Sequence, residues 1–469
     1  MLKNKGIKQV VRFAFVASSA AVITACSSIS AGNLFSHYSM QNSAVYRAVE
    51  LGDYQQAEDL LPDLVGGDIL DNMEKGRVTF LNQSYSESKS YLESSEWAVR
   101  KQQEQATISI SESAKDLGSL AINDNLKTYH PADYELGFMH LYLGLNYLKE
   151  NSLEGALVEV RKANQVQERA KAERQSELEA AENEMKQSGL SPNLGSILAN
   201  YPDAGSSLQA VQNGYLLYLS ALLYETAGEL NNAYVDYRRA LAVMPENREV
   251  IDGTIRVAKS LGMRSDLALL TKEYGNRQRL ADGQSRIIVI DEQGVVSAKQ
   301  GWKQSLPVYS NGDWAYYTLS LPYYPNAVSP RFATLKLDSK AFTHSKLVNV
   351  NVMAQQDLSE RLPTILIRQA LRVIAKEQLR RETSNKDDVG NLLINVWNVL
   401  TEQPDTRGWQ TLPANVYSSS SVVAAGKHTL SYADNIYPIT TEPNQTTLVW
   451  LSRQGNSSTI WHKQLGNLQ

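Results

Sequence analysis

The residues of this chain that could take part in chemistry are scattered and do not gather into motifs. No two of the six histidines stand three or four residues apart, so the sequence predicts no zinc site of the His-x-x-x-His type; they are His37, His130, His140, His344, His428 and His462. His140 occupies the place of a large helix-packing residue. The chain has no G-x-S-x-G elbow, no P-loop and no G-x-G-x-x-G loop. We therefore expect no enzyme activity, no small-molecule substrate, and no catalytic, metal-binding or cofactor-binding residue.

Three polar clusters are the remaining candidates. Asp387-Asp388 lies in a polar loop, where solvation explains it, and the serines from Ser418 to Ser421 have no histidine nearby in sequence to act as a base. Asp405, Arg407 and Trp409 combine an acid, a base and a tryptophan within five residues. They form either a candidate recognition loop with polar and aromatic contacts, or an ion pair that fixes a loop while the tryptophan fills a sheet edge. We favour the ion pair.

The N-terminal residues predict a cleaved leader. Basic residues between Lys3 and Arg12 precede an apolar segment from Phe13 to Ile23, which is too short to span a membrane. The segment ends in Ile23-Thr24-Ala25-Cys26, which resembles the lipobox of bacterial lipoproteins. The resemblance implies a lipoprotein signal peptide over residues 1–25, lipidation of Cys26, and a tether over 26–33. An ordinary secretory leader with an incidental cysteine is the alternative.

Cys26 is also the only cysteine in 469 residues, so an intramolecular disulfide is excluded. Two or more acyl chains would hold the protein stably in a membrane. In known lipoproteins an aspartate after the cysteine tends to retain the protein in the inner membrane, and here that residue is Ser27. We therefore expect a lipid-anchored protein of the outer membrane that faces the periplasm.

Composition is that of a globular protein. Hydrophobic residues make up 42% and charged residues 20% of the chain. No stretch after the leader offers a second apolar segment long enough to span a membrane. The net charge of −4, with both signs interspersed, provides no surface for a polyanion, so nucleic acid is not an expected partner.

The stretch from Tyr215 to Pro245, with helical sequence continuing to Gly275, matches the second half of a tetratricopeptide signature. Small residues let two antiparallel helices approach closely, and a glycine ends the first helix of each pair. Gly262 follows Gly228 by 34 residues, which is the period of this repeat. The positions assigned to repeat packing here are Gly228, Ala233, Tyr237, Ala240, Pro245 and Gly262.

Two earlier stretches repeat parts of this pattern. One is a turn and second-helix start that begins at Gly52, and the other has the same tyrosine-to-alanine offsets as the first unit. Their packing positions are Gly52, Ala57, Gly144, Tyr147, Ala156 and Ala163. A generic helical bundle is the alternative, because small and aromatic residues recur in any packed helices. We predict a tetratricopeptide-like helical repeat domain over residues 34–283.

An insertion near residues 165–214 interrupts the repeats. Residues 169–186 are rich in Ala, Glu, Gln, Lys and Arg, and their only large apolar residues are Leu178 and Met185. So narrow an apolar seam cannot belong to a core helix. We predict a long exposed helix, which is either a solvated spacer or, less favoured, a binding arm.

The composition changes after Gly283, and residues 284–469 predict a smaller α+β domain. β-branched runs predict strands at 286–290, 314–321, 332–337, 347–352, 428–430, 446–451 and 458–461, with another near 422. Apolar residues at helical spacing predict helices over 358–374 and 389–400. The first has an arginine face, which we interpret as solvated; a contact with an anionic polymer or lipid headgroup is the alternative. The fold class is therefore mainly α, with a repeat array followed by this domain.

Several of these stretches together carry a family resemblance. The Gly52-Asp53-Tyr54 unit, Asp133-Tyr134-Glu135, the unit from His140 to Arg161, and the run from Asp405 to Pro413 resemble an uncharacterised family of proteobacterial lipoproteins with tetratricopeptide-like repeats. The resemblance covers nearly the whole mature chain and supplies no catalytic residue. Such proteins are often encoded beside lipoproteins that activate penicillin-binding proteins, which implies a role in the envelope.

We expect an adaptor or scaffold that binds an envelope protein or peptide in a groove of the repeats, in cell-wall synthesis or envelope assembly. First-helix residues are expected to line this groove, among them Tyr142, Asn146, Leu216 and Tyr218. The alternatives are a structural subunit of a secretion, pilus or flagellar assembly, and a cell-wall-acting enzyme that uses the repeats for targeting. A deep polar pocket between the Arg407 loop and the helix containing Arg361 and Arg380 would favour the enzyme.

Overall fold

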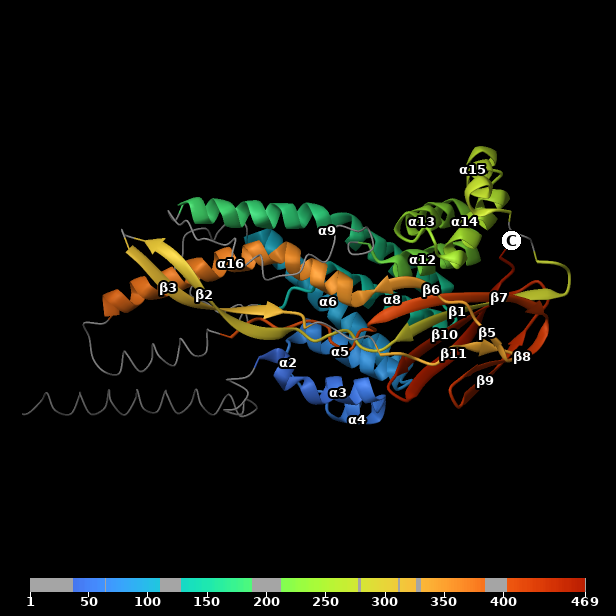
Figure 1. Ribbon diagram of the computed structural model, residues 1–469, viewed down its shortest axis with the longest axis horizontal. Helices are drawn as coiled ribbons and strands as arrows, with labels where there is room; N and C mark the ends of the chain where they lie inside the picture. The colour runs from blue at the N-terminus through green and yellow to red at the C-terminus, as the bar shows by residue number, and fades with distance from the viewer. Residues whose placement is uncertain are drawn as a thin grey trace, which may run out of the picture.

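The computed structural model describes residues 37–63, 65–109, 128–187, 212–276, 280–310, 313–325, 330–383 and 403–468. The predicted leader, Cys26, Asp387-Asp388 and the helix predicted over 389–400 lie outside these residues. The N-terminal part of what is described is helical (Figure 1). Its helices are α2 (Tyr38–Gln41), α3 (Ser43–Leu51), α4 (Tyr54–Asp59), α5 (Asp68–Leu81), α6 (Tyr85–Ser109), α8 (Asp133–Lys149), α9 (Leu153–Gln187), α12 (Gly214–Thr226), α13 (Leu230–Val243), α14 (Arg248–Ser260) and α15 (Arg264–Tyr274).

The same tight turn joins the helices of the pairs α3/α4, α5/α6, α8/α9, α12/α13 and α14/α15. In each turn one residue has a positive φ, and these are Gly52, Gln83, Asn151, Gly228 and Gly262. The amide of that residue donates to the carbonyl three residues earlier, and the next amide donates to the carbonyl five residues before it. At Gly228 and Gly262 the surroundings are open, so the positive φ is what requires glycine there. The predicted helical repeat region is confirmed at this level.

Small residues lie where the helices of a pair come together. A Cβ at Gly144 of α8 would lie 3.6 Å from the carbonyl oxygen of Ala156 in α9. The side chain of Tyr147 is half-buried, and that of Tyr237 is fully buried and donates to Glu225 Oε2 at 2.8 Å. Pro245 lies in the turn that follows α13. The alanines assigned to packing all have no exposed surface: Ala57, Ala156, Ala163, Ala233 and Ala240.

The C-terminal part contains the strands and one long helix, α16 (Val350–Thr383). A mixed five-stranded sheet has the order β11-β10-β1-β7-β6, in which β1 runs parallel to β10 and antiparallel to β7. A second sheet has the order β5-β4-β8-β9, and β2 and β3 form a hairpin. The strands are β1 (Gln284–Gln293), β2 (Gln300–Ser310), β3 (Asp313–Tyr323), β4 (Lys336–Leu337), β5 (Lys340–Ala341), β6 (Ser345–Asn349), β7 (Asn415–Ala424), β8 (Gly426–Tyr432), β9 (Asn435–Thr441), β10 (Thr446–Gln454) and β11 (Ser457–Gly466).

The five-stranded sheet is buried on both faces. Along β1, Ile288 and Ile290 belong to the apolar cluster of the helices, whereas Ile287 and Val289 belong to a second cluster shared with β4, β8 and β9. This alternation follows from the two-residue period of a strand. The molecule therefore has three layers here, with the helices, the five-stranded sheet and the small sheet in that order.

Two predicted strands are wrong in part. The run over 347–352 is not one strand, because β6 ends at Asn349 and α16 begins at Val350. The alternating valines therefore lie on two elements, and the side chain of Asn349 accepts from the amide of Val352 at 3.2 Å in the first turn of α16. The strand predicted over 332–337 is reduced to β4, which has two residues.

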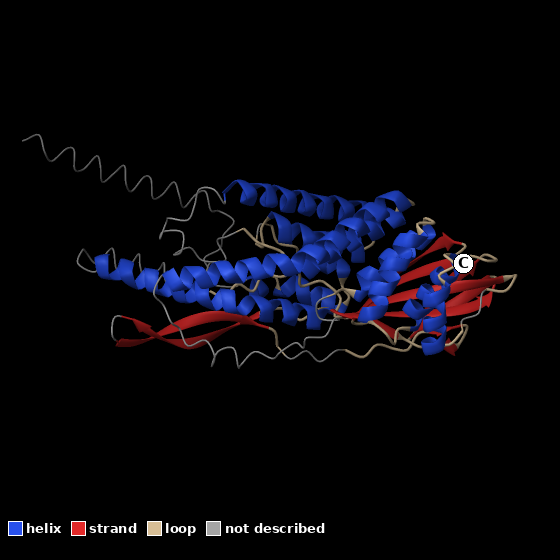
Figure 2. Ribbon diagram, turned by 90° about the horizontal axis from the view of Figure 1, so that it is seen from above, coloured by secondary structure: helices blue, strands red, loops and turns tan. Residues whose placement is uncertain are grey.

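An elongated arm extends from the body at the end opposite the five-stranded sheet (Figures 1 and 2). It consists of the distal parts of α9 and α16 and the β2–β3 hairpin, and Gln369 of α16 donates to the carbonyl of Ser320 in β3 at 2.7 Å. α9 runs without a break from the α8/α9 pair into the predicted insertion, where Glu179, Ala180 and Asn183 are exposed. Among the described residues, no helix combines the length and apolar composition needed to cross a membrane.

Candidate functional site

The predicted partner-binding groove would be lined by residues of the first helices. In the described part of the chain these residues are buried, so the predicted position of the binding surface is wrong. Tyr142, Asn146, Leu216 and Tyr218 are at most 1% exposed. Asn146 donates to Ser88 of α6, and Tyr218 packs against Tyr237, so both are enclosed by other helices. The remaining space is occupied by the chain's own sheet, whose apolar helix-facing side requires cover.

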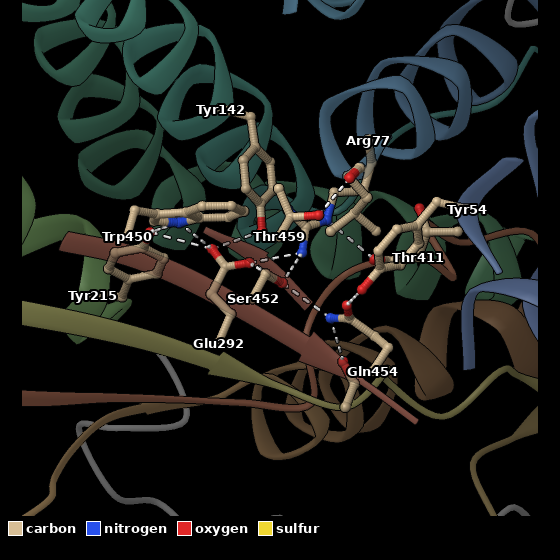
Figure 3. A network of polar contacts seen from close by, with 12 residues as sticks. Tyr54, Arg77, Tyr142, Tyr215, Glu292, Thr411, Trp450, Ser452, Gln454 and Thr459 are labelled. Carbon is tan, nitrogen blue, oxygen red and sulfur yellow. Dashed lines mark hydrogen bonds and ion pairs between the residues drawn. The ribbon is translucent and has the colours of Figure 1, made fainter. Parts of the chain in front are cut away.

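A buried ion pair lies at the centre of the contact between the helices and the sheet (Figure 3). Arg77 of α5 and Glu292 of β1 are both 0% exposed, and Arg77 Nη2 lies 2.6 Å from Glu292 Oε2. Tyr142 of α8 and Tyr215 of α12 donate to Glu292 Oε1 at 3.1 and 3.2 Å, and Trp450 of β10 donates to the same oxygen at 3.1 Å. Side chains from α5, α8, α12 and β10 therefore meet at one carboxylate of β1.

The network extends from this pair towards α4. Ser452 donates to Glu292 Oε2 at 3.1 Å and accepts from Gln454 Nε2 at 3.0 Å, and the Tyr54 hydroxyl donates to Gln454 Oε1 at 2.5 Å. The Arg77 guanidinium also lies 4.4 Å from the centre of the Tyr142 ring. Such a buried network fixes how the sheet is seated on the helices, and its burial leaves no access for a substrate.

The structure places the candidate recognition loop mostly in the interior. Arg407 donates to Asp405 through Nε at 2.9 Å and through Nη2 at 2.7 Å. Burial opposes the charge on Asp405, but the hydrogen bonds and the charge of Arg407 lower the pKa of this carboxyl below its usual value. Trp409 is 1% exposed and its ring meets that of Tyr142 edge-on at 5.9 Å. The structure therefore agrees with the interpretation in which an Asp405–Arg407 ion pair fixes the loop, and Trp409 lies in the core.

Two carboxylates of the helices bind the backbone of this loop, much as a groove would bind a peptide. Glu135 of α8 accepts from the amide of Trp409 at 2.7 Å. Glu74 of α5 accepts from the amide of Gln410 at 2.7 Å and from the hydroxyl of Thr411 at 2.5 Å. Burial raises the pKa of Glu74 to about 7. The sequence pattern assigned no binding role to either glutamate, because a glutamate in a helix ordinarily indicates a solvated face.

A polar cavity lies where the enzyme alternative requires one, between the Arg407 loop and α16. Its volume is about 180 Å³, which is below the range of about 300–1,000 Å³ typical of small-molecule sites. The charges that line it are largely matched within the protein: Arg407 binds Asp405, and Arg361 Nε lies 3.0 Å from Asp357 Oδ1. These two ion pairs account for four of the charged side chains that line the cavity.

The serine run does meet a histidine in the folded chain. Ser419 Oγ lies 3.4 Å from His344 Nδ1, and burial lowers the pKa of His344. The nearby carboxylate of Asp291 is bound by Arg453 through both oxygens. Ser419 is only 1% exposed. These residues therefore form no accessible Ser-His-Asp arrangement.

His140 lies in α8 and pairs with a carboxylate. Its Nδ1 is 2.8 Å from Glu159 Oε2 of α9, and both side chains are buried. His140 therefore packs between α8 and α9, as its place in the repeat pattern predicts. Within the described ranges, no three His, Cys, Asp or Glu side chains are arranged to hold a metal ion.

The second helices of three successive pairs, α9, α13 and α15, expose apolar side chains on their outer face at a regular spacing. Polar contacts join these helices: Arg161 of α9 to Glu229 before α13 at 2.6 Å, and Tyr234 of α13 to Asp266 of α15 at 2.6 Å. Among the residues whose side chains are described, each helix also exposes one large aliphatic side chain, at the same repeat position. These are Val158 of α9, Val235 of α13 and Leu269 of α15, which are 40%, 56% and 65% exposed.

We define this set of three as the outer aliphatic row. Val158 and Val235 each follow a packing alanine by two residues, and Leu269 follows Val235 by one repeat of 34 residues. Single exposed apolar residues need no explanation. Recurrence at one repeat position in three neighbouring helices points to a shared role on one surface.

No family model matches the chain, and no curated protein matches it. Among solved structures, the chain is similar to MamA of AMB-1 in its P212121 crystal form, with 12% identity and a TM-score of 0.27 over 50% of this chain and 88% of that one. A second crystal structure of MamA shares 9% identity with a TM-score of 0.27, over 52% and 97% of the two chains. The TPR2AB domain of yeast Sti1, in its complex with pHSP90, shares 11% identity with a TM-score of 0.19, over 50% and 88%. Because these TM-scores are low, we base the description of the helical repeats on the turn geometry of the helix pairs and not on these similarities.

Proposed function

We propose that this protein is a lipid-anchored scaffold of the cell envelope that acts without catalysis and binds a partner protein through the outer face of its helices. The outer aliphatic row is the observation on which the proposal rests. Val158, Val235 and Leu269 lie on helices that polar contacts hold side by side, so a partner can bury all three together. The inner side of the array is already occupied by the sheet and by the loop from Asp405 to Ala414.

The anchor of the proposed scaffold is Cys26, as the lipobox-like sequence Ile23-Thr24-Ala25-Cys26 suggests. Membrane attachment fixes the N-terminus of the mature protein. The arm formed by α9, α16 and the β2–β3 hairpin extends the molecule away from its body. Labelling with radioactive palmitate tests this part of the proposal. The full-length chain is expected to incorporate label and lose its leader, whereas Cys26→Ser is expected to do neither.

The partner-binding part is tested by purification from native membranes followed by mass spectrometry. The full-length chain is expected to recover one envelope protein, and Val235→Asp/Leu269→Asp is expected to lose it because two charges then lie in the contact. Ile436→Asp is the matched control, since Ile436 is an exposed aliphatic residue, 74% accessible, on β9. Recovery of the same protein by all three chains would exclude the outer aliphatic row as the binding surface.

A structural subunit of a larger secretion, pilus or flagellar assembly is the competing function. Size-exclusion chromatography of detergent extracts separates the two, because a subunit elutes with a large complex of fixed composition. An adaptor with one partner elutes near the mass of the pair.

A further inference from the structure

A second cavity lies at the seam between the helices and the five-stranded sheet. Its volume is about 600 Å³, within the range of about 300–1,000 Å³ that small-molecule sites occupy. α14 forms one wall, and β1, β7 and the segment over 341–343 contribute the others. Polar and charged side chains dominate its lining, among them Arg248, Arg256, Lys259, Arg286, Ser420 and Ser421.

Arg286 is the arginine of this lining that contains a buried nitrogen without a hydrogen-bond partner among the residues that the structure describes. It stands on the helix-facing side of β1 with Ile288, Ile290 and Glu292, and Glu292 is matched by Arg77. Among the residues that the structure describes, no acceptor lies within hydrogen-bond distance of Arg286 Nη1, although that atom is buried. A buried guanidinium nitrogen without an acceptor is unfavourable.

The neighbouring carboxylate is already occupied. Arg256 donates to both oxygens of Glu225, through Nε at 2.5 Å and Nη2 at 2.7 Å, and Tyr237 donates to Oε2 at 2.8 Å. Glu225 favours the charged form of Arg286, but the hydrogen bonds to its carboxylate come from Arg256 and Tyr237. Burial, and then the charge of Arg256, lower the pKa of Arg286 to about 10, so Arg286 still carries its charge at neutral pH.

Acidic residues in the same cavity restrict what fits. Glu249, Asp252 and Asp282 also line it. Glu249 accepts from the hydroxyls of Ser418 at 3.0 Å and Ser420 at 3.3 Å, which turns its carboxylate towards β7. Three acids in one cavity disfavour a ligand with more than one anionic group. They are compatible with a ligand that has one oxyanion group and hydroxyl or amino groups elsewhere.

We propose that this cavity is a binding site for a small molecule with a single carboxylate or phosphate group, which Arg286 binds through its guanidinium. The planar fork of a guanidinium matches both kinds of oxyanion, and burial strengthens such a charge-assisted hydrogen bond. Ser420, Ser421 and Asn444 provide hydrogen-bonding groups for the remainder of the ligand. Because the site joins α14 to β1 and β7, bound ligand stabilises the seam between helices and sheet.

The experiment is thermal unfolding of the purified full-length chain in detergent, in sodium chloride, sodium acetate or sodium phosphate at equal ionic strength. Acetate probes a carboxylate group and inorganic phosphate probes a phosphate group. At least one of them is expected to raise the unfolding midpoint above that in chloride, and to do so in a saturable manner. Equal midpoints in all three salts would overturn the proposal.

Variants separate a specific site from a general salt effect. Arg286→Gln is expected to abolish the response to the active anion while leaving the midpoint in chloride unchanged or higher, because a desolvated charge has been removed. Arg286→Lys keeps the charge without the fork and is expected to weaken the anion's apparent affinity by about tenfold, which equals about 1.4 kcal/mol. If Arg286→Gln does not fold, the response of Arg286→Lys decides the test.

Arg264→Gln, at an exposed arginine of α15, is the control for net charge and is expected to respond as the wild type does. An undiminished response in the Arg286 variants would refute the assignment.

Discussion

At the scale of single residues, buried carboxylates hold the sheet and its preceding loop against the helices. Glu292 accepts from Arg77, Ser452, Tyr142, Tyr215 and Trp450. Two further carboxylates, Glu74 and Glu135, accept from backbone amides of the loop from Asp405 to Ala414. Since these groups are removed from water, the loss of one partner leaves a charge that the interior cannot solvate.

The Arg77–Glu292 pair gives a first prediction. Arg77→Met is expected to lower the free energy of unfolding by about 3–5 kcal/mol, because the Glu292 carboxylate then remains buried without its cation. Arg77→Met combined with Glu292→Gln is expected to restore part of that loss, since neither charge remains. Urea denaturation of the single and double variants measures the coupling.

Lys75→Met provides the control for this pair, since Lys75 lies on the same helix and pairs with exposed Asp63. It is expected to have little effect. Additive losses from Arg77→Met and Glu292→Gln would mean that the two side chains do not depend on each other.

Glu74 gives a prediction about pH. Burial raises its pKa to about 7 in the folded protein, against the hydrogen bonds from Thr411, Gln410 and Tyr38. In the unfolded chain the pKa is about 4.3, so folding favours the protonated acid. This contribution to stability is complete below about pH 4.3 and is lost as the pH rises towards 7.

The free energy of unfolding of the wild type is therefore expected to fall between about pH 5 and 7 relative to that of Glu74→Gln, which stays neutral throughout. The difference is expected to exceed about 1 kcal/mol. Urea denaturation at several pH values and constant ionic strength measures it. Parallel curves for the two proteins would show that Glu74 is ionised in the folded state over this whole range.

At the scale of elements, the helix pairs depend on their turns and on alanines, and the arm depends on helix continuity. Ala156, Ala163, Ala233 and Ala240 are fully buried between neighbouring helices. α9 continues beyond its partner helix α8, so its distal part leaves the packed body. The two helices of this pair can contact each other only over the length of α8. The part of α9 beyond α8 therefore extends into the arm.

Enlarging a packing alanine gives the prediction at this scale. Ala233→Leu is expected to lower the free energy of unfolding by about 1–3 kcal/mol, because the extra atoms have no space where α13 meets its neighbours. Val235→Leu, two residues further along the same helix and exposed, is expected to change it by less than about 0.5 kcal/mol. Equal urea midpoints for both variants would mean that the helices are not in close contact at Ala233.

At the scale of the whole molecule, the helices and the five-stranded sheet share one core. β1 begins at Gln284, one residue after the predicted domain boundary. Nevertheless, one apolar cluster contains Tyr142 and Leu216 from the helices together with Ile290 and Trp450 from the sheet. Neither part buries its apolar face without the other, so the sequence boundary does not separate two independent cores.

A shared core predicts cooperative unfolding. Far-ultraviolet circular dichroism reports mainly on the helices, and tryptophan fluorescence reports largely on the sheet side, where Trp409, Trp450 and Trp461 are buried. The two signals are expected to change at the same urea concentration. Arg77→Met serves as the comparison, since weakening the seam is expected to shift both signals together. Separate midpoints in the wild type would indicate two independently folding parts.

Local interactions account for what the sequence predicted well. Gly228 and Gly262 mark turns because a positive φ is a property of one residue, and the isoleucines and valine from Ile287 to Ile290 mark β1 because alternation needs only neighbours. Asn151 and Gln83 make the same turn without glycine, so the residue with a positive φ is not marked by its type in those two turns. The change from β6 to α16 at Val350 was also missed, because valines are compatible with both elements.

The sequence by itself determined the helix–turn–helix units, the order of helices before strands, and the places where small residues must lie. Only the tertiary structure decided that the inner side of the array is filled by the chain's own sheet, and that Glu292 meets an arginine 215 residues away. It also decided that a buried nitrogen of Arg286 makes no hydrogen bond within the described residues. The physical reason is that turns and periodic faces arise from residues close together in sequence. The pairing of buried charges depends on which distant elements meet, and no local pattern records that.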